Sequence, residues 1–290
     1  TARSGTSNDG TLRPGKNRRT RRTSSVTHPD MTLIVGITFS DIGGALLSDT
    51  RVTFASGQTR DMVRKAYSIG RFMAAGFAGS VAIGFDLIRN LTLNLQLPAA
   101  AQDNVWEPDW VAREWSPIAR AIFEEAPEAE RSHGSRILIV GFDPKGTGAR
   151  LIRLAAPTFE PQFLRQGLRM CSIGTGSRDR RIMREVRRYA DMRTTPAELL
   201  QGGIALWAGA LADYVGQESG THLGSAVGRH FHVLTVESRG FNLYASRRKS
   251  FVDWQDEPID LDPMPTVAES YGQFCKMAEA DGLASAAARC

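Results

Sequence analysis

The chain is poor in cysteine and contains no long hydrophobic run. Cys171, Cys275 and Cys290 are an odd, widely spaced set without Cys-x-x-Cys spacing, which excludes a disulfide framework and argues against a zinc site. No apolar run approaches the roughly 18 to 20 residues that a membrane-spanning helix needs, and the N-terminal residues lack the apolar segment of a secretory signal. We therefore expect a soluble, cytoplasmic protein that does not contact a membrane.

The excess of positive charge is confined to the N-terminal stretch. Residues 1–30 contain seven Lys/Arg and two Asp/Glu, and basic and acidic residues are equal in number over the rest of the chain, so the net charge of +5 lies in this stretch. Because it is rich in Gly, Ser, Thr and Arg and has little to bury, we expect it to be disordered. We interpret residues 1–31 as a leader, a propeptide or a misread upstream stretch. A nucleic-acid role for the Arg-rich centre, 18–22, is the weaker alternative, and no nucleic-acid partner is predicted.

Blocks of strands alternate with blocks of helices along the chain. The patterns predict strands over 32–39, 45–49, 65–70, 72–78, 136–142, 149–155, 170–174, 230–237 and 241–246, with helices from Val81 to before Pro98 and over 108–126, 179–191 and 196–216. This order does not suit a parallel βαβ fold. It favours an α+β fold in which two stacked antiparallel sheets are flanked by helices.

No linker or repeat divides the central part of the chain. We expect one domain over 32–250, followed by a C-terminal extension, 251–290, whose residues 265–289 are predicted to be partly helical. On the second helix we expect one apolar face formed by Trp110, Trp115, Ile118 and Ile122.

Thr32 follows Met31 and opens an apolar strand. If residues 1–31 are absent or removed, Thr32 carries both a hydroxyl nucleophile and a free α-amine, whose ordinary pKa of about 7.7 to 8.0 suits a base near neutral pH. Removal of Met31 as an initiator would expose Thr32 without self-cleavage. A nucleophile and its base would then belong to one residue, a combination that suggests amide-bond hydrolysis.

Three further positions have both a structural and a chemical interpretation. Asp49 could be a turn aspartate that ends a strand, and Gly79 could be a turn glycine that precedes a helix. Lys65 could be a solvated lysine, although it stands directly before an apolar strand. Placed near Thr32, the same three residues would supply a carboxylate, a cation and a backbone N–H group.

Together these segments resemble a β-type proteasome subunit, within the N-terminal-nucleophile hydrolases. The resemblance rests on Thr32–Gly36, Ser48–Arg51, Lys65 and Ala75–Gly79; it is densest over 32–85 and looser to about 246. It implies a four-layer αββα sandwich. It also implies a threonine peptidase without metal or cofactor that works inside a homo-oligomeric ring on peptide or unfolded-protein substrates. An ATP-dependent unfoldase partner is left undetermined.

The resemblance assigns roles position by position. Thr32 is the nucleophile, Lys65 lowers the pKa of the groups it faces, Asp49 orients Lys65, and the N–H group of Gly79 stabilises the oxyanion. The interval from Thr32 to Asp49 is one residue longer than usual, which a longer turn over 41–44 would absorb. The interval from Lys65 to Gly79 matches without a gap.

Later positions match less closely. A hydroxyl beside the N-terminal amine would come from Thr175, or alternatively from Ser177, and a second one from Ser225. The family usually has an aspartate three residues before Ser225, where this chain has His222; His222 itself, Asp213 or Glu218 could substitute for that aspartate.

The resemblance also implies a substrate-binding region. Its apolar pocket would prefer hydrophobic or small neutral side chains, and backbone groups beside it would add an extended peptide as a strand. The residues are Val52, Val63, Tyr67 and Phe77 for the pocket, and Thr53 and Gly79 for the backbone. A metal site at His222, His230 and His232 is the weaker interpretation, because the sequence places no carboxylate near the last two.

Two rival functions share this pattern. An amidase acting on a small amide would use the same Thr32 chemistry. A non-catalytic ring subunit would keep the fold with Thr32 blocked behind residues 1–31.

Overall fold

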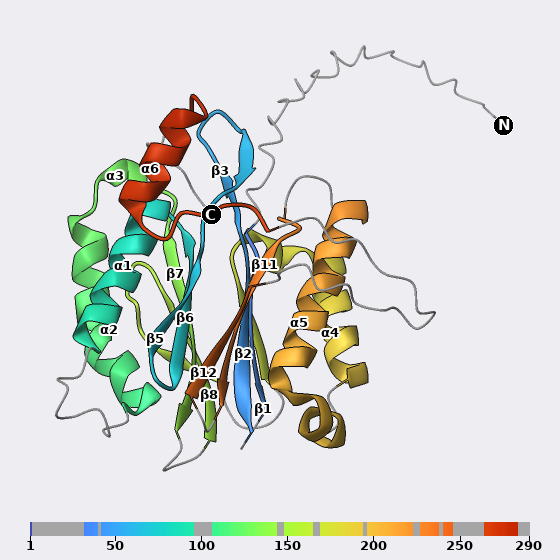
Figure 1. Ribbon diagram of the computed structural model, residues 1–290. Coiled ribbons are helices and arrows are strands. Elements are labelled where there is room, and N and C mark those ends of the chain that lie inside the picture. The colour runs from blue at the N-terminus through green and yellow to red at the C-terminus, as the bar shows by residue number, and fades with distance from the viewer. Residues whose placement is uncertain are drawn as a thin grey trace.

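Two antiparallel sheets lie face to face between two layers of helices in the computed structural model (Figure 1). The structure describes Thr1 and residues 32–39, 42–95, 106–143, 148–164, 169–193, 196–222, 227–237, 240–245 and 264–283. Helices α1 and α2 cover one sheet, and α4 and α5 cover the other. The predicted α+β sandwich of two stacked antiparallel sheets flanked by helices is confirmed.

The first sheet contains the strand that begins just after Thr32. Its strand order is β10-β1-β2-β11-β12, and every neighbouring pair is antiparallel. The antiparallel pairing of β1 with β2 places the start of β1 opposite the end of β2, with Ile34 paired to Ser48. The strands are β1 (Ile34–Phe39), β2 (Gly43–Asp49), β10 (Arg169–Ile173), β11 (Phe231–Glu237) and β12 (Gly240–Ala245).

The second sheet follows the chain order β5-β6-β7-β8-β9, and a separate two-stranded ribbon, β3-β4, extends from the sandwich. Strands that follow one another along the chain are neighbours in this sheet, but the connection from β6 to β7 contains α1, α2 and α3. The strands are β3 (Arg51–Thr53), β4 (Thr59–Asp61), β5 (Ala66–Gly70), β6 (Met73–Gly79), β7 (Ser135–Asp143), β8 (Gly148–Ala155) and β9 (Gln162–Phe163).

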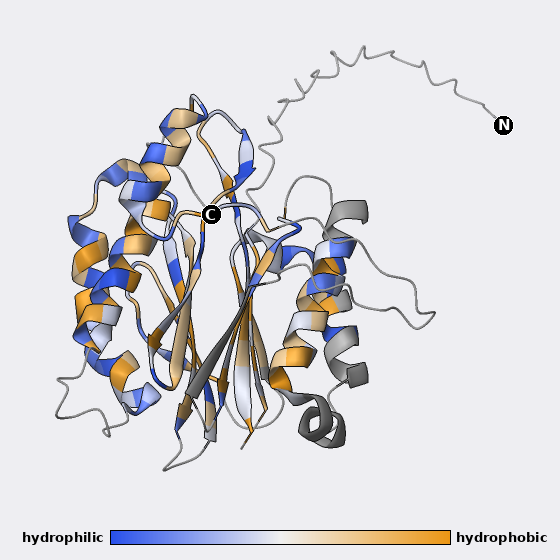
Figure 2. Cartoon of the chain, in the orientation of Figure 1, coloured by the Kyte–Doolittle hydropathy of each residue, from blue (hydrophilic) through white to orange (hydrophobic). Residues whose placement is uncertain are grey.

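The helices turn apolar faces toward the sheets. Figure 2 shows apolar residues in orange and polar residues in blue interspersed along α1 and α2. Helix α1 begins at Ser80, whose hydroxyl accepts a hydrogen bond from the N–H of Ile83. Helix α5 has a non-helical kink at Gly203. The helices are α1 (Val81–Asn94), α2 (Pro108–Glu125), α3 (Glu128–Arg131), the 3-10 helix η2 (Thr175–Arg178), α4 (Arg180–Arg193), α5 (Pro196–His222) and α6 (Tyr271–Ala280).

Alternating residues of β1 separate two of the three buried cores. Val35 and Ile37 point toward α4 and α5, whereas Ile34 points toward the second sheet. Gly36 also faces that sheet, and a Cβ atom there would lie 2.6 Å from a side-chain carbon of Leu151. The two sheets therefore approach closely because small residues stand between them.

The predicted face of α2 is correct for two of its four residues. Trp115 is buried and Ile122 packs against the core, but Trp110 and Ile118 are 45% and 41% exposed. The buried side of the helix also carries Val111, Ala112, Ala119 and Phe123, which lie at the 3.6-residue period with Trp115.

The C-terminal helix is shorter than the predicted range, and it joins the main core. Phe274 and Ala278 of α6 are fully buried in the same apolar cluster as residues of β3, β6, α1 and α2. In Figure 1 this helix lies beside the β3 ribbon and the start of α1.

Candidate active site

Thr32 lies where the N-terminal end of β1 meets the start of β5. The ammonium Nζ of Lys65, the residue before β5, is 3.1 Å from the Thr32 hydroxyl oxygen and 2.8 Å from Oδ1 of Asp49. Lys65 also donates a hydrogen bond to the carbonyl oxygen of Arg51. All three of its hydrogens therefore have acceptors, which holds the cation in one place.

Asp49 ends β2 and is held from two sides. Its Oδ1 accepts a hydrogen bond from the N–H of Leu33 at 3.3 Å, and its Oδ2 accepts one from the N–H of Gly228 at 3.1 Å. Burial raises the pKa of Asp49, outweighing the opposing effects of the Lys65 charge and of these hydrogen bonds. Both side chains of the Asp49–Lys65 pair are fully buried.

The carbonyl oxygen of Thr32 lies against two glycines at the start of η2. The N–H of Gly176 donates to the Thr32 oxygen at 2.9 Å, and Gly174 lies so close that a Cβ atom would be 2.2 Å from the same oxygen. Gly174 also has a φ of +88°, a conformation that favours glycine. The glycines of this loop thus allow the chain to pass directly against Thr32.

Thr175 stands between these two glycines. Its hydroxyl oxygen is buried and has no hydrogen-bond partner among the residues that the structure describes. Ser177, the alternative, donates its hydroxyl to the carbonyl of Gly174 at 2.5 Å. Because buried hydroxyls normally have hydrogen-bond partners, the unpaired hydroxyl of Thr175 is better placed than that of Ser177 to bind a further group.

Gly79 ends β6, directly before the Ser80 cap of α1. Its φ is +115°, and a Cβ atom there would lie 2.2 Å from the carbonyl oxygen of Gly134. Ser80 is fixed in turn, because its N–H donates to Gly134 and its hydroxyl donates to Glu130 at 2.5 Å. The backbone at Gly79 is therefore held firmly at a helix start, where N–H groups lack partners within the helix.

The predicted pocket residues are largely enclosed. Val52, Val63 and Phe77 have no exposed surface, and Tyr67 is partly buried against the same core. The side chain of Thr53, the last residue of β3, is also largely buried.

Of the later candidates for the missing carboxylate and the second hydroxyl, only the side chain of Asp213 lies within the described residues. Asp213 lies on α5, where burial raises its pKa to about 6. Ser225 and the side chains of Glu218 and His222 fall outside the described residues.

His230 corrects one expectation, because a carboxylate lies beside it. Its Nδ1 is 3.4 Å from Oδ2 of Asp61, which also forms a two-pronged ion pair with Arg51. Arg51 and Asp61 are cross-strand partners at one end of the β3–β4 ribbon, and no local pattern indicates that His230 joins them. Within the described part of the chain, no group of three His, Cys, Asp or Glu side chains could hold a metal ion.

A family model for the proteasome subunit matches residues 31–192. This chain belongs to the proteasome subunit family. The match includes Thr32, Asp49, Lys65, Gly79 and Thr175, and the observed sandwich is consistent with this family. The chain is therefore a proteasome-like subunit of the N-terminal-nucleophile type, a class that indicates oligomeric assembly. The comparison with curated proteins found no match.

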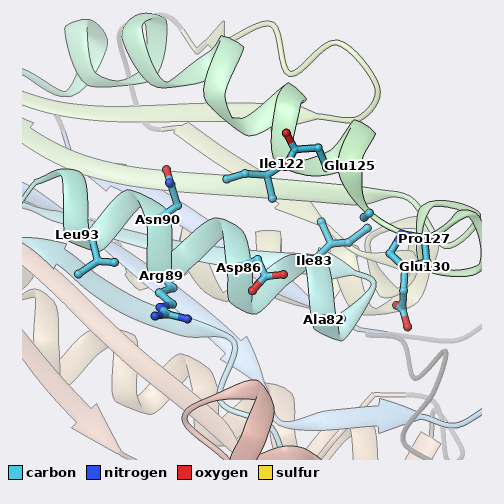
Figure 3. A pocket seen from close by; sticks show the side chains of 11 residues that line it. Ala82, Ile83, Asp86, Arg89, Asn90, Leu93, Ile122, Glu125, Pro127 and Glu130 are labelled. Atoms are coloured by element: carbon cyan, nitrogen blue, oxygen red, sulfur yellow. The ribbon is translucent and has the colours of Figure 1, made fainter.

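An open groove lies apart from the cluster around Thr32. It has a volume of about 490 Å³ and runs between α1, α2 and α3, with Asp86, Arg89, Glu125 and Glu130 along it (Figure 3).

Among the described helices, none combines the length and apolar character needed to cross a bilayer.

Proposed function

We propose that this chain is a threonine-type peptidase in which Thr32 is the nucleophile. The observation that supports this most strongly is the 3.1 Å contact between the Thr32 hydroxyl and the buried ammonium of Lys65. Lys65 is oriented by Asp49 and placed by a second bond to the Arg51 carbonyl. A fixed cation at this distance stabilises an alkoxide and disfavours protonation of a nearby amine.

The reaction begins when the Thr32 hydroxyl oxygen attacks a peptide carbonyl. The hydroxyl proton passes to the α-amine of Thr32, directly or through water, and the Gly79 N–H stabilises the negative charge that forms on the carbonyl oxygen. The C–N bond then breaks, the leaving amine takes a proton, and an ester links the acyl group to Thr32. Water, with the same amine as base, hydrolyses this ester and restores the hydroxyl.

This mechanism requires a free amine on Thr32. In the chain of 290 residues, the Thr32 nitrogen forms a peptide bond with Met31. The catalytic form must therefore begin at Thr32, after methionine removal or cleavage of a longer leader. We further propose that such subunits form a homo-oligomeric ring in the cytoplasm that acts on peptides or unfolded proteins, with or without an ATP-dependent unfoldase.

The blocked nitrogen also favours a second candidate, a silent ring subunit that retains residues 1–31. Intact-mass analysis of the protein made in cells separates the two. A mass that begins at Thr32, together with covalent labelling of Thr32 by a peptide epoxyketone, supports the peptidase. A mass that retains Met31, without labelling, supports the silent subunit.

The Thr32→Ala variant tests the nucleophile itself. We expect it to lose peptide hydrolysis by about 10⁴-fold or more while remaining folded. A variant that kept full activity would refute the proposed function. Cleavage of simple amides without any cleavage of fluorogenic peptides would instead favour an amidase.

A further inference from the structure

The C-terminal segment 264–283 forms a wall beside the residues that lead to Lys65. Ala268 pairs with Val63 in a parallel bridge, donating its N–H to the Met62 carbonyl at 2.8 Å and accepting from the N–H of Arg64 at 3.0 Å. Arg64 also forms a 2.8 Å ion pair with Glu269. The segment is thus attached by backbone and side-chain contacts one residue away from the cation that touches Thr32.

Helix α6 continues from this attachment and inserts its apolar side into the core. Ser270 caps the helix by accepting a hydrogen bond from the N–H of Gln273 at 3.3 Å. The ring of Phe274 has no exposed surface and stacks on Phe54, with 5.9 Å between ring centres and an interplanar angle of 18°. Phe54 directly follows β3, so α6 packs against the ribbon at the edge of the proposed site.

Helix α6 shares a buried apolar cluster with the predicted pocket. Phe274 and Ala278 belong to the same cluster as Val52, Val63 and Phe77, which are themselves fully buried. Because protein interiors contain few voids, a large substrate side chain can contact those residues only if a buried side chain of this cluster moves. Phe274 is a candidate for that side chain, because it stacks on Phe54 at the end of β3 and its helix is attached beside Val63.

We propose that α6, through Phe274, sets the size of the substrate side chain that this site accepts. With the ring in place, the site takes only small residues such as alanine before the bond that is cut. Removal of the ring leaves a cavity that admits large apolar residues. Phe274 is thus a specificity-determining residue, an assignment that rests on the proposed function.

The test compares the chain beginning at Thr32 with its Phe274→Ala variant on paired peptides that carry Ala or Leu before the cut bond. We expect the ratio of kcat/KM for Leu over Ala to rise by at least about 10-fold in the variant. Phe123→Ala is the matched control, because Phe123 is a largely buried ring of the same core that packs against Phe159 from α2. It should lose similar stability and keep the wild-type ratio.

A second measurement does not depend on activity. Benzene binds dry apolar cavities, so it should raise the Tm of Phe274→Ala but not that of the wild type. Phe274→Leu, which removes less volume, should show a smaller shift and serves if the alanine variant unfolds.

The outcomes separate this proposal from the one on which it rests. An unchanged Leu-to-Ala ratio in Phe274→Ala, or a wild type that already prefers Leu, would overturn the role of α6 while Thr32 chemistry stands. Absence of peptide cleavage and of epoxyketone labelling in every chain would overturn the proposed function, and the specificity assignment with it. Benzene binding in that case would still show the cavity that Phe274 fills.

Discussion

Two ion pairs diverge from the short stretch around Arg51, and their surroundings differ. The Asp49–Lys65 pair is fully buried at 2.8 Å, whereas the Arg51–Asp61 pair lies at the rim at 2.7 Å with side chains 17% and 15% exposed. Lys65 contacts the backbone carbonyl of Arg51, so the two pairs share one residue. The comparison therefore sets a fully buried carboxylate beside a partly exposed one, each with its own hydrogen-bond and charge partners.

The two carboxylates respond in opposite directions. Burial raises the pKa of Asp49 despite Lys65 and two N–H donors. Burial also acts to raise the pKa of Asp61, but hydrogen bonds from His230 and Arg51 and their charges outweigh it and lower that pKa to about 2. A buried pair that leaves its carboxylate poorly stabilised is weak support for stability, and we interpret it as an arrangement for chemistry. We expect the rim pair to stabilise the fold, because it lowers the pKa of its carboxylate.

The Lys65→Met substitution should have the largest effect, because it removes the cation of the buried pair. We expect peptide hydrolysis to fall by about 10³-fold, because the cation beside Thr32 is lost. Stability should also fall by about 3 to 5 kcal/mol, since Asp49 would remain buried without its partner. Urea unfolding and peptide assays measure the two effects. The double variant Lys65→Met with Asp49→Asn should recover most of the stability and none of the activity; recovery of activity would contradict the role of Lys65.

His232 is a further buried titratable group, and its titration can be compared with that of Asp61 in the rim pair. Burial, then the charges of Arg64 and Lys65, lower its pKa to about 4. The folded state resists protonation, so this group's contribution to stability is complete above pH 6.5 and is lost as the pH falls toward 4, by about 3 kcal/mol. The difference in unfolding free energy between wild type and His232→Gln should be constant above pH 6.5 and shift by this amount below it. A constant difference down to pH 4 would exclude the titration.

Asp61→Asn tests the stabilising role of the rim pair. The depressed pKa of Asp61 means that its stabilisation is present above about pH 4 and is lost as the pH falls toward 2. We expect a loss of about 2 kcal/mol at pH 6 that shrinks to nothing near pH 2, measured by denaturant unfolding. Glu128→Gln is the control, because its pair with Arg131 leaves the glutamate 80% exposed and should contribute less than about 0.5 kcal/mol. Equal losses of unfolding free energy in Asp61→Asn and Glu128→Gln would show that the rim pair stabilises the fold no more than an exposed pair does.

Thr175→Val should give the smallest effect and separates chemistry from packing. The Thr175 hydroxyl has no partner among the described residues, so its replacement by a methyl group should change stability by less than about 0.5 kcal/mol. If that hydroxyl serves the Thr32 amine, activity should fall by roughly 10-fold, a change of about 1.4 kcal/mol. Ser177→Ala is the comparison variant. A large stability loss with normal activity would make the Thr175 hydroxyl structural.

Local patterns predicted most of the sandwich. The hairpins β1–β2, β5–β6 and β7–β8 were predicted because apolar alternation and turn residues lie within a few positions of each other. The ribbon β3–β4 was missed, since its second strand reads Thr-Arg-Asp and carries no apolar alternation. The buried face of α2 was predicted only in part, because an aromatic residue such as Trp110 can lie on either the sheet side or the solvent side of a helix.

The candidate site was predictable only in part, for a similar reason. Asp49 and Lys65 stood out by their spacing and by the family resemblance, and their side chains do meet at Thr32. The N–H of Gly228 that holds Asp49 comes from 179 residues away, and no local pattern indicates such a contact. The burial of Phe274 in the cluster that contains the predicted pocket residues was equally unpredictable, because a short amphipathic helix does not indicate which core it joins.

The sequence alone determined the period of each strand and helix, the confinement of excess charge to residues 1–30, and the types of chemical group available at Thr32, Asp49 and Lys65. Tertiary structure decided which of these groups lie in contact, how deeply they are buried, and which segment closes the apolar space beside them. The physical reason is that pKa values and pocket volumes depend on neighbours brought together across the sheets, whereas periodicity depends on neighbours along the chain.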